Sequence, residues 1–187
     1  MRNVSRLYVI FAFLIINFLL ASYTHHNANN PSFLYYDSLY KKSVSYIENE
    51  ELEKSIILLD DIVSKQRQYS NRDNCLIMNA HYDLGQIYLS RAMNYDLAIN
   101  HFEYIFNNIQ STYGSVDTFS GMKSLKELKE KSLFMLGYIY HNHVGNFSIS
   151  QSYYSTFLAT FPNSELCFSV EYELGLINKE ILNFKNK

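Results

Sequence analysis

Two stretches of this chain carry the same pattern of residues, and this repetition constrains the fold more than any other feature. In each stretch a leucine and a glycine precede a tyrosine, and a second segment then carries a small residue followed four positions later by an aromatic one. The copies are His81-x-x-Leu84-Gly85-x-x-Tyr88 with Asn94-Tyr95-x-x-Ala98-x-x-x-Phe102, and Phe134-x-Leu136-Gly137-x-x-Tyr140 with Asn146-Phe147-x-x-Ser150-x-x-x-Tyr154. A repeated helical hairpin cannot bury its apolar face alone, so we expect the copies to stack on one another.

The composition favours helices and excludes several functions. Among 187 residues there are only two prolines and six glycines, which is too few turn residues for a sandwich or barrel built of many short strands. A hydrophobic content of 48% is ample for a core, so we predict an all-α fold. The net charge of −2 and the lack of a Lys/Arg stripe argue against nucleic acid as a partner.

Two weaker copies flank the strong ones. The first is Tyr40-x-x-Ser43-x-x-Tyr46 with Leu52-x-x-Ser55-x-x-x-Leu59-x-x-Ile62, in which Ser43 replaces the glycine. The last copy, which begins near Ser164, gives Tyr172-x-Leu174-Gly175 and reads as a single capping helix. Within a hairpin, we expect the glycine of the first helix to face the bulky aromatic of the second, because small residues let two helices approach closely.

This pattern resembles the tetratricopeptide repeat, a helix-turn-helix unit with Leu-Gly-x-x-Tyr in its first helix and a small residue, then an aromatic one, in its second. The stretch from Phe157 to Gly175, with Pro162 at the closing position, resembles the repeats of bacterial envelope proteins of the outer-membrane-assembly lipoprotein and cell-division-coordinator types. The resemblance covers most of the chain after Pro31. It implies a right-handed solenoid over residues 32–187, with about three antiparallel hairpins and a C-terminal capping helix.

The resemblance also implies a binding site on the concave face, which the first helices of the repeats line. Two positions of each repeat, two residues before the leucine and one after the glycine, would face a bound peptide. We therefore predict a peptide-binding groove formed by Tyr40, Tyr82, Gln86, Phe134, Tyr138 and Tyr172, with Val44 and Leu176 at equivalent positions. Two alternatives stay open: these rings pack against adjacent helices, or the chain is a structural subunit of a membrane-associated assembly that contacts partners through its convex face.

The amino terminus predicts export. Arg2 and Arg6 precede an uncharged apolar run from Leu7 to Ala21, so residues 1–22 have the form of a signal peptide or an N-terminal membrane anchor. Tyr23 stands where a lipid-bearing cysteine would follow Leu20-Ala21-Ser22, which excludes a lipid anchor at that site. Residues 23–31 read as a disordered spacer. We expect the folded domain in the periplasm, or anchored in the inner membrane and outside the cytoplasm, with another envelope or secretion protein as its partner.

Catalytic and metal-binding motifs are not apparent. The sequence has no Gly-rich phosphate loop and no nucleophile motif, so we expect a protein that is not an enzyme and needs no cofactor or metal. His141-x-His143 lacks accompanying Cys or carboxylate ligands and is read as a pair of surface histidines. Glu48, Glu50, Glu51 and Glu53 are read as helix-end charges. Cys75 and Cys167 precede different repeats, so we expect them to be unpaired and partly buried.

The connections between repeats are irregular. The excess residues fall at 67–74 and at 110–124, and the second segment is read as a loop because it is rich in Gly, Ser and Thr without periodicity. The following stretch, Leu125 to Lys131, spaces opposite charges three and four residues apart and is expected to extend the first helix of the third repeat.

Overall fold

The computed structural model describes residues 31–64, 71–109 and 122–185, and every regular element in these ranges is a helix. In chain order these are α2 (Pro31–Glu48), α3 (Leu52–Ser64), α4 (Asn71–Ser90), α5 (Tyr95–Asn108), α6 (Leu125–Ile139), the π-helical turn η2 (Tyr140–Val144), α7 (Phe147–Thr160) and α8 (Cys167–Lys185). The predicted signal or anchor at 1–22, nearly all of the spacer and loop residues 110–121 lie outside the described residues.

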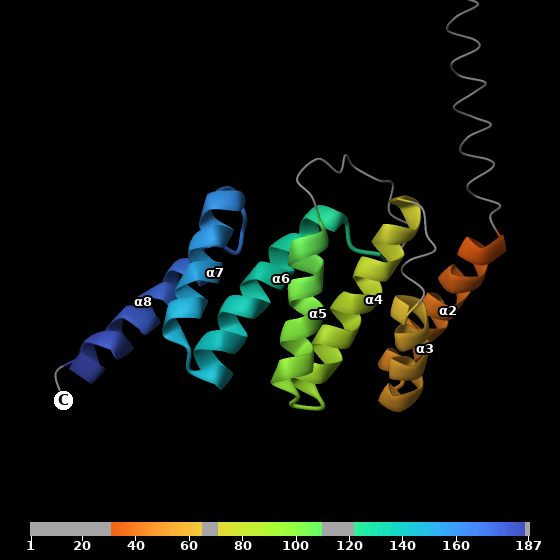
Figure 1. Cartoon of the computed structure of the whole chain (residues 1–187), viewed down its shortest axis with the longest axis horizontal. Coiled ribbons are helices and arrows are strands. Elements are labelled where there is room, and N and C mark those ends of the chain that lie inside the picture. Colours follow the sequence, from red (N-terminus) through yellow and green to blue (C-terminus); the bar gives the residue numbers. More distant parts are fainter. Residues whose placement is uncertain (1–30, 65–70, 110–121, 186–187) are drawn as a thin grey trace, which may run out of the picture.

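The helices pack as neighbours along the chain. The closest pairs are α2 with α3, α4 with α5 and α6 with α7, while α8 packs on α7. Figure 1 shows these helices side by side in one elongated row, with α2 at one end and α8 at the other. The all-α prediction is confirmed, and the packing of adjacent helix pairs is compatible with a helical solenoid.

Three clusters of buried residues join neighbouring helix pairs rather than lying within single pairs. The first cluster includes Leu59, Ile62 and Leu84 and therefore connects α3 to α4. The second includes Phe102 and Leu136 and connects α5 to α6, and the third joins Leu133 of α6 to Val170 of α8. Because each apolar face is completed by the next pair of helices, the pairs are stabilised by stacking.

The contact between the helices of each strong repeat is built around a glycine, as the sequence predicts. A Cβ atom added to Gly85 would lie 2.8 Å from Cε1 of Phe102 on α5, and one added to Gly137 would overlap the ring of Tyr154 on α7. Both rings are fully buried, so they have little room to move away. Glycine is therefore required at both positions by close packing.

A serine on the second helix adds a hydrogen bond at this contact. Ser150 Oγ donates to the carbonyl oxygen of Gly137 at 2.7 Å, and Ser55 Oγ donates to that of Ser43 at 3.0 Å in the first hairpin. Ala98 occupies the equivalent position of the second hairpin, where no hydroxyl is present. The three hairpins thus share one arrangement at the seam, with the hydrogen bond in two of them.

The turns inside the second and third hairpins also match. Asn94 caps α5 by accepting a hydrogen bond from the Leu97 amide at 3.1 Å, and Asn146 caps α7 in the same way at 3.2 Å from the Ile149 amide. The residue before each cap has a positive φ, 49° at Met93 and 72° at Gly145. Both turns therefore require a positive φ, which glycine adopts without strain at position 145 and methionine adopts only with strain at position 93.

Several predicted boundaries agree with the structure and others differ. α6 begins at Leu125, and α7 ends at Thr160 just before Phe161 and Pro162, as predicted. α4 begins at Asn71, so the last four residues of the segment 67–74 are helical rather than irregular. α2 begins at Pro31, the residue assigned to the end of the spacer, and α8 begins at Cys167 rather than next to Ser164. Proline is well suited to a first helical position because it needs no hydrogen bond to its nitrogen.

None of the helices in the described ranges has the length and apolar character that crossing a membrane requires.

Candidate functional site

The predicted aromatic row does not form a uniformly open surface. Tyr40 and Tyr82 are 4% and 6% exposed, Phe134 is half-buried, and Tyr172 is 60% exposed. Exposure of these rings increases along the row of helices. Each of the first three rings lies on a helix that is followed by another repeat, whereas Tyr172 lies on the last described helix. The first two rings therefore take part in the packing between repeats.

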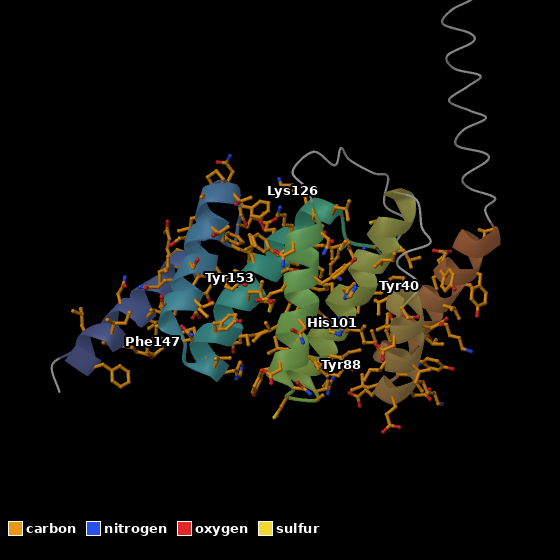
Figure 2. The ribbon with its side chains drawn as sticks, in the orientation of Figure 1. Tyr40, Tyr88, His101, Lys126, Phe147 and Tyr153 are labelled. Atoms are coloured by element: carbon orange, nitrogen blue, oxygen red, sulfur yellow. The ribbon has the colours of Figure 1, made fainter. Side chains whose placement is uncertain are left out.

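Tyr40 connects α2 to α4 through a partly buried hydrogen bond. Its hydroxyl donates to Oδ2 of Asp83 at 2.8 Å, and Figure 2 shows Tyr40 between the first hairpin and α4. Burial raises the pKa of the Asp83 carboxyl, while the Tyr40 hydroxyl and the Lys123 ammonium group partly offset that rise. Burial and the nearby Asp83 also raise the pKa of Tyr40, so its phenol stays protonated and remains a donor.

Two polar side chains, Gln86 and Lys123, contact Tyr82. Gln86 donates from Nε2 to the Tyr82 hydroxyl at 3.1 Å, and Lys123 Nζ lies 4.7 Å from the centre of the Tyr82 ring. Lys123 Nζ also lies 4.0 Å from Oδ1 of Asp83. Burial raises the pKa of Tyr82 to about 12, so the ring is neutral at physiological pH. Gln86 itself is half-buried and keeps a part of its side chain at the surface.

Asn79, which belongs to none of the sequence motifs, holds the segment that brings Lys123 to this position. Its side-chain amide accepts from the backbone nitrogen of Lys123 at 2.9 Å and donates to the backbone oxygen of the same residue at 3.0 Å. The asparagine is fully buried on α4. In the sequence, Asn79 stands out only as a polar residue on the buried face of a predicted helix. That pattern does not identify Lys123, its hydrogen-bond partner 44 residues away.

The remaining predicted groove residues lie on α6 and α8. Phe134 packs toward Tyr154, with ring centres 6.1 Å apart, and Tyr138 is half-buried with its ring 5.6 Å from that of His143. Tyr172 is exposed on α8, and Leu176 is half-buried one turn later. These positions, together with Gln86, offer surface to a partner, whereas Tyr40 and Tyr82 lie beneath the surface.

A polar cleft of about 570 Å³ lies along the first turns of α6. One wall consists of Lys126, Glu127, Glu130 and Lys131, and the other is the connection between α7 and α8, residues 160–166. Lys126, labelled in Figure 2, marks the end of α6 where the cleft lies. Helical periodicity places Glu130 and Phe134 on one face of α6, with Lys131 and Tyr138 close to it. The cleft therefore continues the row of predicted groove residues.

The charges in the cleft are only partly paired. Lys131 Nζ lies 2.7 Å from Oε1 of Glu127. Among the described residues, Lys126, Glu130 and Glu165 have no ion-pair partner and line the cleft with free charges of both signs. Such a surface can hydrogen-bond a peptide backbone and pair with charged side chains, while an apolar small molecule would find little buried surface there.

Two histidines, His81 buried and His101 half-buried, form a pair between α4 and α5. Nδ1 of His81 lies 2.9 Å from Nδ1 of His101, and the His81 ring stacks on Tyr104 with centres 4.0 Å apart. Figure 2 shows His101 next to Tyr88, on which it stacks. Burial lowers the pKa of His81 to about 3 and that of His101 to about 4, with repulsion between the two rings adding to the shift at His81. Both imidazoles are therefore neutral, and one donates to the other.

His141 is not a surface histidine, and the prediction that it would be is wrong. Its side chain is buried in η2, with Nδ1 2.8 Å from Oε2 of Glu173 and Nε2 3.7 Å from Oε2 of Glu180, both on α8. His143, by contrast, is exposed and stacks on Tyr95 with centres 4.2 Å apart. His141 thus connects the third hairpin to the last helix, a contact that sequence spacing alone does not reveal.

The cysteines and the acidic residues at the start of α3 are the other candidate chemical groups. Cys75 is buried and Cys167 half-buried, and both are free thiols as predicted. Across residues 31–64, 71–109 and 122–185, no three His, Cys, Asp or Glu side chains come together as metal ligands would. Glu53 lies in the first turn of α3. Glu51 immediately precedes this helix and forms an ion pair with Lys54, so both residues agree with the prediction of helix-end charges.

Comparison with protein-family models, with curated proteins and with solved structures found no match for this chain.

Proposed function

We propose that this protein is a non-enzymatic scaffold that binds a segment of another protein along the face formed by α4, α6 and α8. The observation that carries the proposal is the polar cleft of about 570 Å³ between α6 and the connection from α7 to α8. An extended or helical peptide would enter this cleft and continue over Phe134 and Tyr138.

The partly exposed aromatic side chains supply the apolar part of this surface. Tyr138 and Phe134 are half-buried and held by neighbouring rings, so they lose little conformational freedom when a partner covers them. Gln86 and Tyr172 would lie at its edges. Tyr40 and Tyr82 would act indirectly, by fixing α2, α4 and the segment around Lys123 in place.

The charges in the cleft define the chemistry of the partner. Glu130 and Glu165 favour a basic side chain, and Lys126 favours an acidic one. We expect a partner segment that carries both charges near an apolar residue. Reversing one of these charges would place like charges against each other, which costs affinity for the partner.

The resemblance to tetratricopeptide repeats and the apolar segment near the amino terminus support an envelope location for this scaffold. In this proposal the folded domain lies on the far side of the membrane from Met1, in the periplasm or anchored by residues 1–22, and its partner is an envelope or secretion protein. A reporter enzyme fused at Lys187 that is active only outside the cytoplasm would support export. Activity restricted to the cytoplasm would contradict it.

Site-specific photo-crosslinking in the native cell tests the binding face. A photoreactive amino acid placed at Lys126 or at Tyr138 is expected to capture one and the same protein, because both residues border the proposed path of the peptide. The matched control is Ser155, which is exposed on α7 and does not border the cleft.

The control position also distinguishes the alternative role. If Ser155 captured the same protein and Lys126 and Tyr138 captured none, the groove would not be the binding surface. A structural subunit that uses its convex face would then account better for the result.

A further inference from the structure

The outer face of α8 is an apolar stripe that nothing in the described part of the chain covers. Phe168 is 80% exposed, Tyr172 60% and Leu182 59%. Helical periodicity places these three side chains on one face with Gly175 at its centre. The opposite face of α8 is buried through Val170 and Ile177, so the helix is apolar on both sides.

Gly175 occupies the position that Gly85 and Gly137 hold in the other repeats. In those repeats an aromatic ring of the second helix packs directly against the glycine, whereas a Cβ added to Gly175 would meet nothing within 4 Å. Figure 1 shows α8 at the end of the row of helices, with no described helix on its outer side. The last helix therefore presents a surface suited to close helix packing but has no helix against it.

The charges that border this stripe are arranged symmetrically about Gly175. Glu171 lies four residues before the glycine and Lys179 four residues after it, while Phe168 and Leu182 lie seven before and seven after. Glu171 and Lys179 are exposed and have no ion-pair partner among the described residues. In an antiparallel pair of identical helices crossing at Gly175, residues equally far before and after the glycine lie at the same height on opposite helices.

We infer that α8 is a homodimer interface, in which the α8 helices of two copies of this chain cross antiparallel at Gly175. Phe168 of one copy then packs on Leu182 of the other along a contact about 21 Å long. Glu171 of one copy meets Lys179 of the other, and the two-fold symmetry repeats each contact. The missing side chain of Gly175 allows the two backbones to approach closely, as at the other glycine contacts of the fold.

A symmetric contact between two α8 helices fits this stripe better than a head-to-tail contact between α8 of one copy and α2 of the next. Leu34 and Tyr35 are exposed at the far end of the row, on α2. A contact between that end and α8 would be heterologous, so it would build open fibres or closed rings rather than a two-fold dimer. The self-complementary charges around Gly175 instead specify a closed dimer. This interface shares Tyr172 with the edge of the proposed binding face but includes none of the residues that line the peptide cleft, so either can be lost while the other remains.

Charge reversal in the purified full-length protein, kept in mild detergent because of residues 7–21, tests the interface. Glu171→Lys or Lys179→Glu alone places like charges opposite each other and is expected to weaken the dimer at least tenfold in sedimentation velocity. The double variant restores opposite charges and is expected to return the dissociation constant to within about threefold of the wild-type value. At a concentration low enough to keep every protein monomeric, circular dichroism should show the same melting for all four proteins, since both residues are exposed.

Cysteine crosslinking provides an independent readout on the same protein. Gly175→Cys is expected to give a disulfide-linked dimer on mild oxidation, because the two-fold axis would bring the two Cys side chains together. Ser155→Cys, exposed on α7, and the wild type with its own two cysteines are expected to form no disulfide-linked dimer in the same assay. Phe168→Ser added to Gly175→Cys should abolish the crosslink.

Several results would overturn the inference. A wild-type protein that stays monomeric at 100 µM, charge variants that all associate alike, or oligomers that grow beyond the dimer would each exclude the antiparallel pair. Capture of a different protein by Gly175→Cys in cells, without the homodimer, would show that α8 accepts a foreign helix instead.

Discussion

The second and third hairpins and the last helix carry the same local sequence but differ in what covers it. Gly85 and Gly137 lie under the buried rings of Phe102 and Tyr154, whereas Gly175 faces open space. Tyr82 and Tyr172 both stand two residues before the leucine that the copies share, and they differ in the same way, at 6% and 60% exposed. The motif therefore specifies a helix with a packing surface, and its place in the row decides whether that surface is buried in the core or stays exposed.

Substituting the three glycines one at a time should give the largest contrast. Gly137→Ala and Gly85→Ala force a Cβ into a buried ring and should destabilise the fold by about 1–3 kcal/mol, with the larger loss at Gly137. Gly175→Ala meets no atom and should stabilise its helix by up to about 1 kcal/mol. Urea unfolding at low protein concentration measures all three. Equal losses at the three positions would refute the comparison.

Acid should weaken the contact between α4 and α5 next. The folded pKa values of His81 and His101 lie below the unfolded value near 6.5, so the unfolded chain binds more protons as the pH falls below that value. Stability is then fully present above pH 6.5 and falls as the pH drops toward 4, by a loss on the order of 2 kcal/mol for the buried His81 at pH 5 and less for the half-buried His101.

A double variant isolates the histidine contribution. His81→Phe with His101→Phe keeps two rings but removes both titrating groups, so its urea midpoint should change less between pH 7 and pH 5 than that of the wild type. Asp83 titrates in both proteins, and burial raises its pKa, so its effect has the opposite sign and cancels in the comparison. An identical pH response in the two proteins would exclude the neutral pair.

Exchange of the seam hydroxyl between hairpins should have a smaller effect. Ser150→Ala removes the hydrogen bond to the Gly137 carbonyl and should cost about 1 kcal/mol. Ala98→Ser introduces the hydroxyl at the equivalent place beside Gly85 and should cost less than Ser150→Ala. Thermal unfolding measures the loss of stability in each variant. A greater loss of stability for Ala98→Ser than for Ser150→Ala would show that the two helix contacts are not equivalent.

The smallest effect is expected at the turn before each asparagine cap. Met93 has φ 49° and is 69% exposed, so Met93→Gly should relieve backbone strain and stabilise the protein by a few tenths of a kcal/mol to about 1 kcal/mol. Gly145→Ala at the matching position of the third hairpin should destabilise it by a similar amount. The difference in melting temperature between the two variants measures this effect, and a change of the same sign in both would contradict it.

The helical hairpins and their glycine contacts could be predicted from sequence because they depend on local spacing. Leu84, Gly85 and Phe102 repeat at fixed intervals, and the intervals determine which faces meet. The boundary at Leu125 also followed from charge spacing. The start of α4 at Asn71 did not, because the residues before Cys75 carry no apolar period that distinguishes a helix from a connection.

The contacts across repeats could not be predicted in the same way. Asn79 binds the backbone of Lys123, and His141 binds Glu173, through pairings that depend on how far one repeat is rotated against the next. The burial of Tyr40 likewise depends on Asp83 of the following repeat. The α6 cleft also arises from tertiary packing, since one wall comes from α6 and the other from a connection about 30 residues later.

The affinity of the captured partner segment for cleft variants tests the central claim, that this protein binds another protein along α6, most directly. Isothermal titration calorimetry with a synthetic segment should show at least a tenfold loss of affinity for Tyr138→Ala and for Glu130→Lys, with melting unchanged, and no loss for Ser155→Ala. Equal affinity for the wild type and both cleft variants, or a loss confined to Ser155→Ala, would contradict the account.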